Sequence, residues 1–174
     1  MKKNVKTKSK LPLVILTICL IILIIIGFFS FYFFYKPKAN YQESYQKTWT
    51  QETLGSLEVD EGVVGYTLSK FNVGELKKIP LTSNTPKIEI DVDGTTYFIE
   101  IKDGKIISTL GEINNEDLKI SMTRGDIINI LNESNNDVEE IRKAINEGTL
   151  NIELIASKPE LIAKGYFSIY GKFS

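Results

Sequence analysis

The chain has 174 residues, with 21 basic and 22 acidic side chains and no histidine. Histidine is the commonest general base and the commonest metal ligand, so its absence disfavours hydrolytic and metal chemistry. All five charged residues before residue 36 are lysines, so residues 36–174 hold 16 basic and 22 acidic side chains, a net charge of −6. This acidic balance disfavours a nucleic-acid-binding domain, which needs a basic face.

Leu11 and Tyr35 bound an uncharged stretch of 25 residues. At about 1.5 Å per helical residue, such a stretch crosses a hydrocarbon core roughly 30 Å thick. The sequence therefore predicts a transmembrane helix over 11–35, in contact with the lipid bilayer. The alternative is a cleaved signal peptide. It is disfavoured because bulky aromatic residues occupy the place where cleavage would fall.

Charge around this stretch predicts its orientation. Five lysines lie in the basic tail 1–10, and only Lys36, Lys38 and Lys47 follow the stretch closely. The excess of lysine favours a cytoplasmic N-terminus and an extracytoplasmic C-terminal domain. We therefore expect a single-pass protein of the cell membrane, with its anchor retained.

Residues 36–57 are predicted to form a linker and a first helix. Tyr41, Tyr45 and Trp49 recur every four residues, which places them on one face of a helix over 41–54. That face has two interpretations, docking on a partner or the bilayer, or packing on the sheet of the domain itself. Residues 63–71 are apolar with a glycine interruption, and they predict a short strand or an extended passage.

Residues 58–174 are predicted to form one α+β domain. Apolar and polar residues alternate over 87–92, 95–101 and 105–110, and the pairs Asp93-Gly94 and Asp103-Gly104 separate these runs. Asp-Gly between alternating runs is typical of a tight hairpin turn. The three runs are therefore predicted to form an antiparallel meander, and a fourth strand is expected over 116–122.

Helices are predicted to follow. Thr123 and Asp126 have the spacing of a capping box, and Gly148 is expected to end a second helix. A fifth strand is predicted over 149–156, and one last helix begins at Pro159. The predicted fold is thus an α+β domain whose antiparallel sheet of about five strands is covered by helices, preceded by one transmembrane helix. Its expected core comprises Ile88, Ile90, Ile99, Ile120, Ile127, Leu131, Ile141, Ile145, Leu150, Ile152, Leu161 and Tyr166.

Acidic residues supply the candidate sites for chemistry. The run Asp91-Val92-Asp93-Gly94 resembles part of a calcium loop, but the further oxygen ligands of such a loop are missing, and a β-turn explains it better. Glu112, Glu116 and Asp117 cluster in a loop where we expect them to be solvated. We predict no catalytic residue, no metal site and no cofactor. Asn132 begins a glycosylation sequon, whose use is left open.

The segment 165–170 is apolar and aromatic on several sides. One interpretation is a C-terminal helix packed into the core, on a stripe of Ile162, Tyr166, Ile169 and Phe173. The other is a helix that lines an apolar cavity or rests on lipid. Periodicity alone does not separate the two.

Residues 88–173 resemble the sterol carrier protein type 2 lipid-binding domain. The resemblance rests on a strand pair around "DG", the strand "EDLKISMT", the capped helix "RGDIINIL", a helix ending in glycine before "GTLNIEL", and a final helix. Family members usually carry Gly-Asp after the penultimate strand, whereas this chain has Ile155, Ala156 and Ser157. Most are also soluble, whereas this chain is expected to be anchored.

The resemblance implies a non-catalytic, membrane-anchored domain that binds a lipid or acyl chain in an apolar tunnel between sheet and helices. The residues it implies as the tunnel lining are Ile127, Ile130, Leu131, Ile141, Ile145, Leu161, Ile162 and Tyr166. The alternative is an extracytoplasmic scaffold with a filled core, which binds envelope protein partners through its helices or the Tyr41/Tyr45/Trp49 face. No nucleic acid is expected as a partner.

Overall fold

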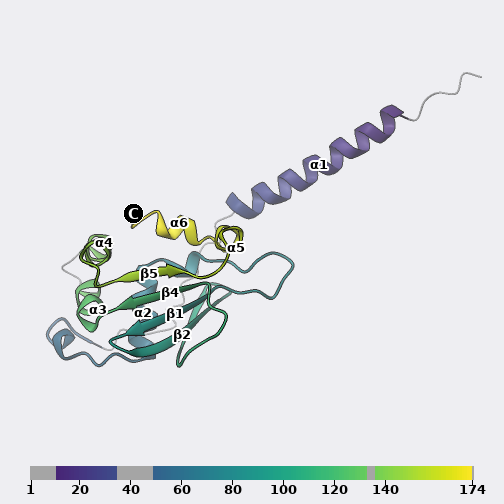
Figure 1. Cartoon of the computed structure of the whole chain (residues 1–174). Coiled ribbons are helices and arrows are strands. Elements are labelled where there is room, and N and C mark those ends of the chain that lie inside the picture. The colour runs from purple at the N-terminus through teal and green to yellow at the C-terminus, as the bar shows by residue number, and fades with distance from the viewer. Residues whose placement is uncertain (1–10, 35–48, 133–135, 174) are drawn as a thin grey trace, which may run out of the picture. The chain divides into compact units, whose positions relative to one another are not determined.

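The structure is a computed structural model that describes residues 11–34, 49–132 and 136–173, except the side chains of 11–14, 29 and 31–34 (Figure 1). The chain divides into two compact units, Met1–Lys38 and Ala39–Ser174.

The first unit contains helix α1, Leu11–Phe34. Pro12 lies in its first turn, where a missing N–H costs no intrahelical hydrogen bond. The large apolar side chains described in α1 are exposed, among them Leu16, Leu20 and Leu23. Within the part of the chain whose residues are described, no helix combines the length and apolarity needed to cross a membrane. The transmembrane span over 11–35 stays a prediction.

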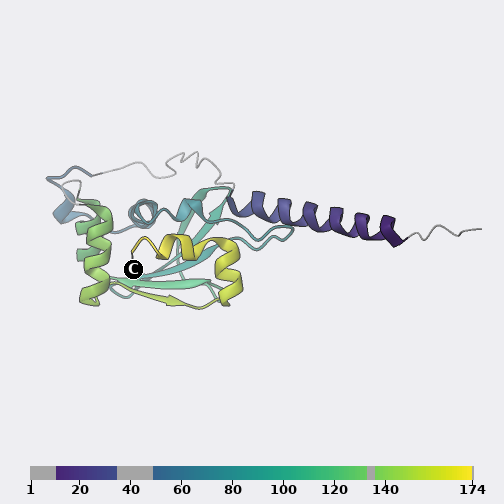
Figure 2. The ribbon, with the colours of Figure 1, turned by 90° about the horizontal axis from the view of Figure 1, so that it is seen from above.

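The second unit is built on a five-stranded sheet with the strand order β3-β2-β1-β4-β5 (Figures 1 and 2). One face of the sheet is apolar, because alternate residues such as Ile88, Ile90 and Val92 on β1 are buried. The strands are β1 (Lys87–Val92), β2 (Thr95–Lys102), β3 (Lys105–Leu110), β4 (Leu118–Met122) and β5 (Asn151–Leu154).

The sheet is mixed, which corrects the antiparallel sheet predicted from the sequence. β1–β2, β2–β3 and β4–β5 pair antiparallel, but β4 runs parallel to β1. Residues 111–117 return the chain past the meander, so β4 adds beside β1 and not beside β3. The prediction was wrong because the alternation of apolar and polar residues shows which face of a strand is buried but not the order or direction of the strands.

Both predicted Asp-Gly hairpins are confirmed. Asp93 and Gly94 have φ of 50° and 86°, and Asp103 and Gly104 have φ of 53° and 79°. Two successive residues with positive φ give the turn whose twist matches that of the flanking strands. The turns fix the register of β1 on β2 and of β2 on β3.

Residues 63–71, predicted as extended, instead belong mainly to helix α2 (Glu61–Lys70). Asp60 caps the helix by accepting a hydrogen bond from the Val63 N–H at 2.8 Å. Val64, Leu68 and Phe71 recur at helical spacing and are buried. Asp60, a capping residue just before the apolar run, was the sequence signal for this helix, but the glycine at position 65 obscured the helical pattern.

Helices α3 (Arg124–Leu131) and α4 (Asp137–Glu147) follow β4. The capping box at Thr123 and Asp126 is confirmed, with the Thr123 N–H donating to the Asp126 carboxylate at 2.8 Å. Gly148, at φ 76°, ends α4 as predicted.

The predicted last helix is two helices, α5 (Lys158–Lys164) and α6 (Tyr166–Tyr170). Gly165 lies between them with φ 92°, a left-handed conformation that interrupts the helix. The break takes Ile162, which is 45 % exposed, out of the buried stripe that Tyr166, Ile169 and Phe173 still form.

The core contains ten of the twelve predicted residues as buried side chains, and Ile145 and Ile152 are partly buried against it. Trp49 is also buried, and its ring meets that of Tyr66 edge-on, with centroids 5.1 Å apart. Trp49 thus packs on its own domain. Tyr41 and Tyr45 lie outside the described residues. Short 3-10 turns, η1 (Leu54–Ser56) and η2 (Val73–Glu75), flank α2.

Candidate functional site

A ladder of apolar side chains crosses three neighbouring strands. Ile88 on β1 pairs with Leu118 on β4, and Leu118 pairs with Leu154 on β5. Two residues further along β4, Ile120 lies opposite Ile152. Because the strand period is two, all five side chains point to the same face of the sheet. They form an apolar floor near the β5 edge.

Helix α6 covers this floor (Figure 2). The turn at Gly165 redirects the chain after α5, so that Tyr166 and Ile169 face the sheet and are buried. Phe173, just beyond α6, packs against Phe71 with ring centroids 5.5 Å apart. This contact fixes the C-terminal end of the segment to the end of α2.

A cavity of about 40 Å³ lies between floor and helix. A single water needs about 10–15 Å³ by the same measure, so the enclosed space has room for roughly three water-sized groups. All twelve lining residues are apolar or aromatic: Phe71, Val73, Ile88, Leu118, Ile120, Ile152, Leu154, Tyr166, Phe167, Ile169, Tyr170 and Phe173.

The cavity opens to solvent on the side of β5 and α6. Leu154, Phe167 and Tyr170 line it, and yet they are 45, 41 and 43 % exposed. Large apolar side chains at a cavity mouth mark a place where an apolar ligand gains contact area. The enclosed space therefore continues into an exposed apolar rim.

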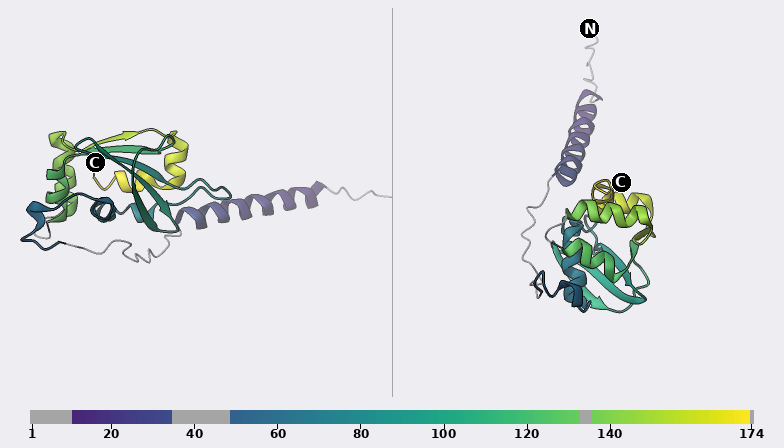
Figure 3. Two further views of the ribbon diagram at one scale, coloured as in Figure 1. Left: turned by 90° about the horizontal axis from the view of Figure 1, so that it is seen from below. Right: turned by 90° about the vertical axis from the view of Figure 1, so that its left-hand side faces the viewer.

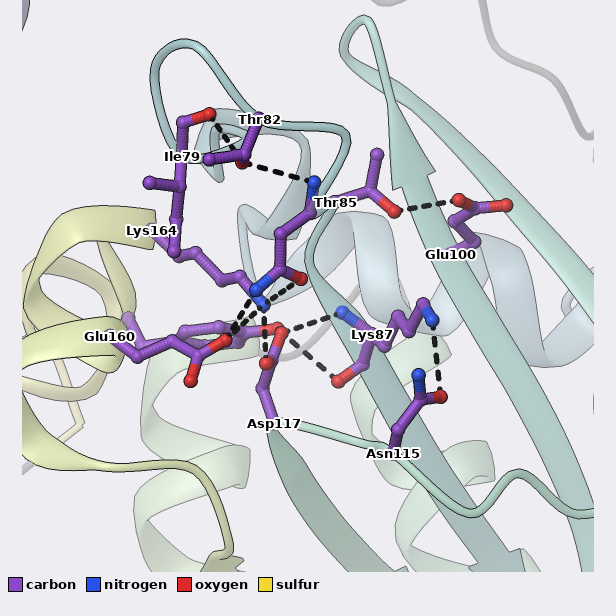
Figure 4. Close-up of polar contacts among 11 residues, drawn as sticks. Ile79, Thr82, Thr85, Lys87, Glu100, Asn115, Asp117, Glu160 and Lys164 are labelled. Carbon is purple, nitrogen blue, oxygen red and sulfur yellow. Dashed lines mark hydrogen bonds and ion pairs between the residues drawn. The ribbon is translucent and has the colours of Figure 1, made fainter.

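A buried polar network adjoins the cavity and shares Tyr166 with it. Figure 4 shows the part of this network around Asp117, Glu160 and Lys164. Asp117 is buried, and its carboxylate oxygens accept from the Lys164 ammonium at 2.5 Å, the Tyr166 hydroxyl at 2.8 Å and the Lys87 N–H at 2.8 Å. The sequence predicted that Glu112, Glu116 and Asp117 form a solvated group. The structure corrects this for Asp117, which is buried, whereas Glu112 is exposed and Glu116 is partly exposed.

Lys164 is only 1 % exposed. Its ammonium donates to Asp117, to the Asn84 side-chain oxygen at 2.9 Å, and to the Glu160 carboxylate at 3.0 Å. A lysine ammonium has three N–H donors, so each has an acceptor. Asn84 also donates to Glu160 at 2.7 Å, which links the loop 77–86 to α5.

The pKa values of the network follow from these contacts. Burial, with the neighbouring Asp117 charge, raises the pKa of the Tyr166 hydroxyl far above its usual value, so the hydroxyl stays protonated. The hydrogen bond from Lys164 lowers the pKa of Glu160. The Tyr166 hydroxyl therefore acts as a hydrogen-bond donor to Asp117, and the network holds α5, α6 and the loop 77–86 together.

The sequence-predicted tunnel residues are distributed differently from this cavity. Of the eight, Tyr166 lines it. Five are buried elsewhere in the core, namely Ile127, Ile130, Leu131, Ile141 and Leu161. Ile145 is partly buried against the core, and Ile162 is exposed.

Most residues that line the cavity were missed by sequence reasoning. The alternation of Ile152 and Leu154 on the fifth strand and the aromatic segment 165–170 were the available signals. The sequence did not reveal the pairing of β4 with β1 or the turn at Gly165.

Among the described residues, no group of three acidic or cysteine side chains is placed to hold a metal ion.

Comparisons with known proteins give weak likenesses only. No family model matches the chain, and no curated protein matches it. Among solved structures, a double mutant of the sec-alkyl sulfatase PisA1 of Pseudomonas sp. has 13 % identity and a TM-score of 0.36 over 55 % of this chain. This chain covers 14 % of that sulfatase.

Two other similar structures are sterol carrier protein 2 domains. UbiJ-SCP2, a ubiquinone synthesis protein, has 9 % identity and a TM-score of 0.34, over 71 % of this chain and 91 % of that one. The palmitated SCP2L2 of Aedes aegypti has 14 % identity and a TM-score of 0.37, over 62 and 91 %. With TM-scores below 0.5, none of these likenesses assigns this chain to a family.

Proposed function

We propose that the unit 39–174 is a non-catalytic domain that binds the alkyl chain of a lipid between α6 and the β1–β4–β5 floor. The observation that carries this proposal is the cavity, whose twelve lining residues are all apolar or aromatic and whose rim is exposed. Apolar surface that stays in contact with water at a concave site favours an apolar ligand.

The polar atoms at the cavity indicate how the ligand would lie. The Tyr166 hydroxyl is occupied by Asp117, whereas Tyr170, at the rim, is 43 % exposed. An alkyl end therefore enters the cavity and the head group stays outside, near Tyr170. The small enclosed volume suits the end of a narrow chain better than a fused-ring ligand.

We further propose that the segment 11–35 anchors this domain in the cell membrane, with the basic tail in the cytoplasm. Support comes from the uncharged length of the segment, the exposed apolar side chains of α1 and the five preceding lysines. An anchored domain meets lipid at high local concentration, which suits a binding site with little enclosed volume.

A photoactivatable palmitate tests the cavity. The full chain is reconstituted in nanodiscs of phosphatidylcholine and phosphatidylglycerol that contain this probe, illuminated, and digested for mass spectrometry. We expect adducts within 152–173 as well as on α1. Ile152→Trp fills the cavity and should lower the 152–173 adduct by about tenfold or more, a loss of about 1.4 kcal/mol. The α1 adduct serves as an internal reference.

Ile107→Trp is the matched control, because Ile107 is 43 % exposed on β3 and does not line the cavity. Its adduct pattern should equal that of the wild type. Thermal melts confirm that each variant folds, since overpacking costs about 1–3 kcal/mol. A wild-type chain labelled on α1 alone would contradict the proposal and favour an interaction domain with a filled core.

A further inference from the structure

Most of the exposed large apolar side chains described in the second unit lie on the segment from β5 to α6. Eight such residues are exposed in its described part, and five of them lie between β5 and α6. A sixth, Leu81, lies in the loop 77–86, which is hydrogen-bonded to α5. We call these six the docking end: Leu81, Leu154, Ile155, Ile162, Phe167 and Tyr170.

Leu81 is the most exposed of them. Its side chain is 98 % exposed and its φ is 61°, a left-handed conformation that is unfavourable for a leucine. The loop is held in place, because the Lys77 N–H donates to the Lys164 carbonyl and Asn84 binds Glu160. Figure 4 shows this loop against α5. With its side chain 98 % exposed, Leu81 gains almost no packing within the described part of the domain that could offset the strain of its backbone.

We propose that the docking end rests on a lipid bilayer, with Leu81, Ile162 and the rim aromatics inserted among the lipid chains. The inference rests on the proposed lipid binding and deepens it, because it names the bilayer as the source of the ligand. The cavity mouth belongs to the same surface: Leu154, Phe167 and Tyr170 are at once exposed and lining. An alkyl chain could pass from bilayer to cavity without crossing water.

Charge and connectivity favour a bilayer over a protein partner. Lys78 lies three residues before Leu81 and Lys158 three residues after Ile155, so lysines lie close in sequence to exposed apolar side chains of the docking end. Such pairs suit an interface, with the apolar part among lipid chains and the ammonium at the head groups. The segment 11–35, proposed above as a membrane anchor, belongs to the same chain, and this also favours a bilayer over a protein partner.

Spin labels on the full chain test the contact. Leu81→Cys, Ile162→Cys and Leu110→Cys are prepared in a Cys19→Ser background, since Cys19 is the only cysteine. Leu110 is the control, because it is 59 % exposed on β3, at the opposite edge of the sheet from β5. In nanodiscs, labels at 81 and 162 should collide more with oxygen than with a nickel complex, and the label at 110 should show the reverse.

A paired variant tests the role in ligand entry. Leu81→Asp with Ile162→Glu makes the docking end polar without touching a lining residue, and aspartate tolerates the conformation of Leu81. The rate of adduct formation in 152–173 should fall several-fold when the palmitate probe is supplied in the bilayer. It should be unchanged when the probe is supplied from a cyclodextrin complex. Leu110→Asp should behave as the wild type with both sources.

The outcomes separate the two proposals. If labels at 81 and 162 are as water-exposed as the label at 110, or couple between two copies of the chain, the docking inference is overturned. It is also overturned if the paired variant matches the wild type with both sources, and lipid binding then stands. If the wild-type chain forms no adduct in 152–173 from either source, the proposed function and the docking inference fail together.

Discussion

Asp117 joins four segments of the chain through one residue. Its carboxylate binds Lys164, Tyr166 and the N–H of Lys87, and its carbonyl oxygen accepts from the N–H groups of Ile155 and Ala156. A buried carboxylate is stable only when such partners surround it. The start of β1, the end of β5, α5 and α6 are therefore held at a common point beside the cavity.

Replacing Tyr166 with phenylalanine should test this point. The variant leaves one oxygen of the buried Asp117 with a donor fewer, and it should lower the free energy of unfolding by about 1.5–3 kcal/mol, the range for a hydrogen bond to a charged group. Urea unfolding of the full chain in detergent, followed by circular dichroism, measures the loss. Tyr170→Phe is the control, since Tyr170 is 43 % exposed.

The same pair predicts a pH dependence. Because the pKa of Tyr166 is raised in the folded state, its contribution to stability is complete below its ordinary value near 10 and is lost as the pH rises above it. Wild-type stability should thus fall more steeply above pH 10 than that of Tyr166→Phe. Parallel curves for the two proteins above pH 10 would show that Tyr166 ionises as freely in the folded state as in the unfolded chain.

Local sequence rules hold best for single elements with their own turns and caps. The hairpin at Asp93-Gly94, the capping box at Thr123 and the stop at Gly148 all have the predicted geometry. Each depends on contacts within a few residues, so the sequence contains what is needed. Two other features were not predicted, namely helix α2, which begins at the Asp60 cap, and the break between α5 and α6 at Gly165. In both cases the effect of the local signal depends on what the segment packs against.

Gly94→Ala tests the hairpin. The φ of 86° is unfavourable for alanine by about 1–2 kcal/mol although no atom obstructs its side chain, so stability should fall by that amount. Thr95→Ala, one residue further on an exposed position, should cost less. Thermal or urea unfolding compares the two variants. Equal losses at 94 and 95 would mean that the turn tolerates a left-handed alanine.

At the scale of the whole molecule, the proposed orientation is open to a direct experiment. Protease added to intact cells should digest the unit 39–174, because the lysine asymmetry predicts that this unit lies outside the cell. Immunoblotting against the C-terminal segment measures its loss, with a cytoplasmic protein as the control for intact membranes. Digestion that occurs only after permeabilisation would reverse the orientation, and a mature form that starts near Asn40 would indicate cleavage of the anchor.

The sequence by itself determined the α+β class, the two hairpins, the helix ends at Thr123 and Gly148, and ten of the buried core residues. These follow from periodicity and from residue types that favour specific φ angles. Only the tertiary structure decided the parallel pairing of β1 with β4, the position of the cavity and the burial of Asp117. Asp117 and Lys164 are 47 residues apart in sequence, and their contact exists only because β4, α5 and α6 meet beside β1. Contacts at that separation leave no periodic trace in the sequence.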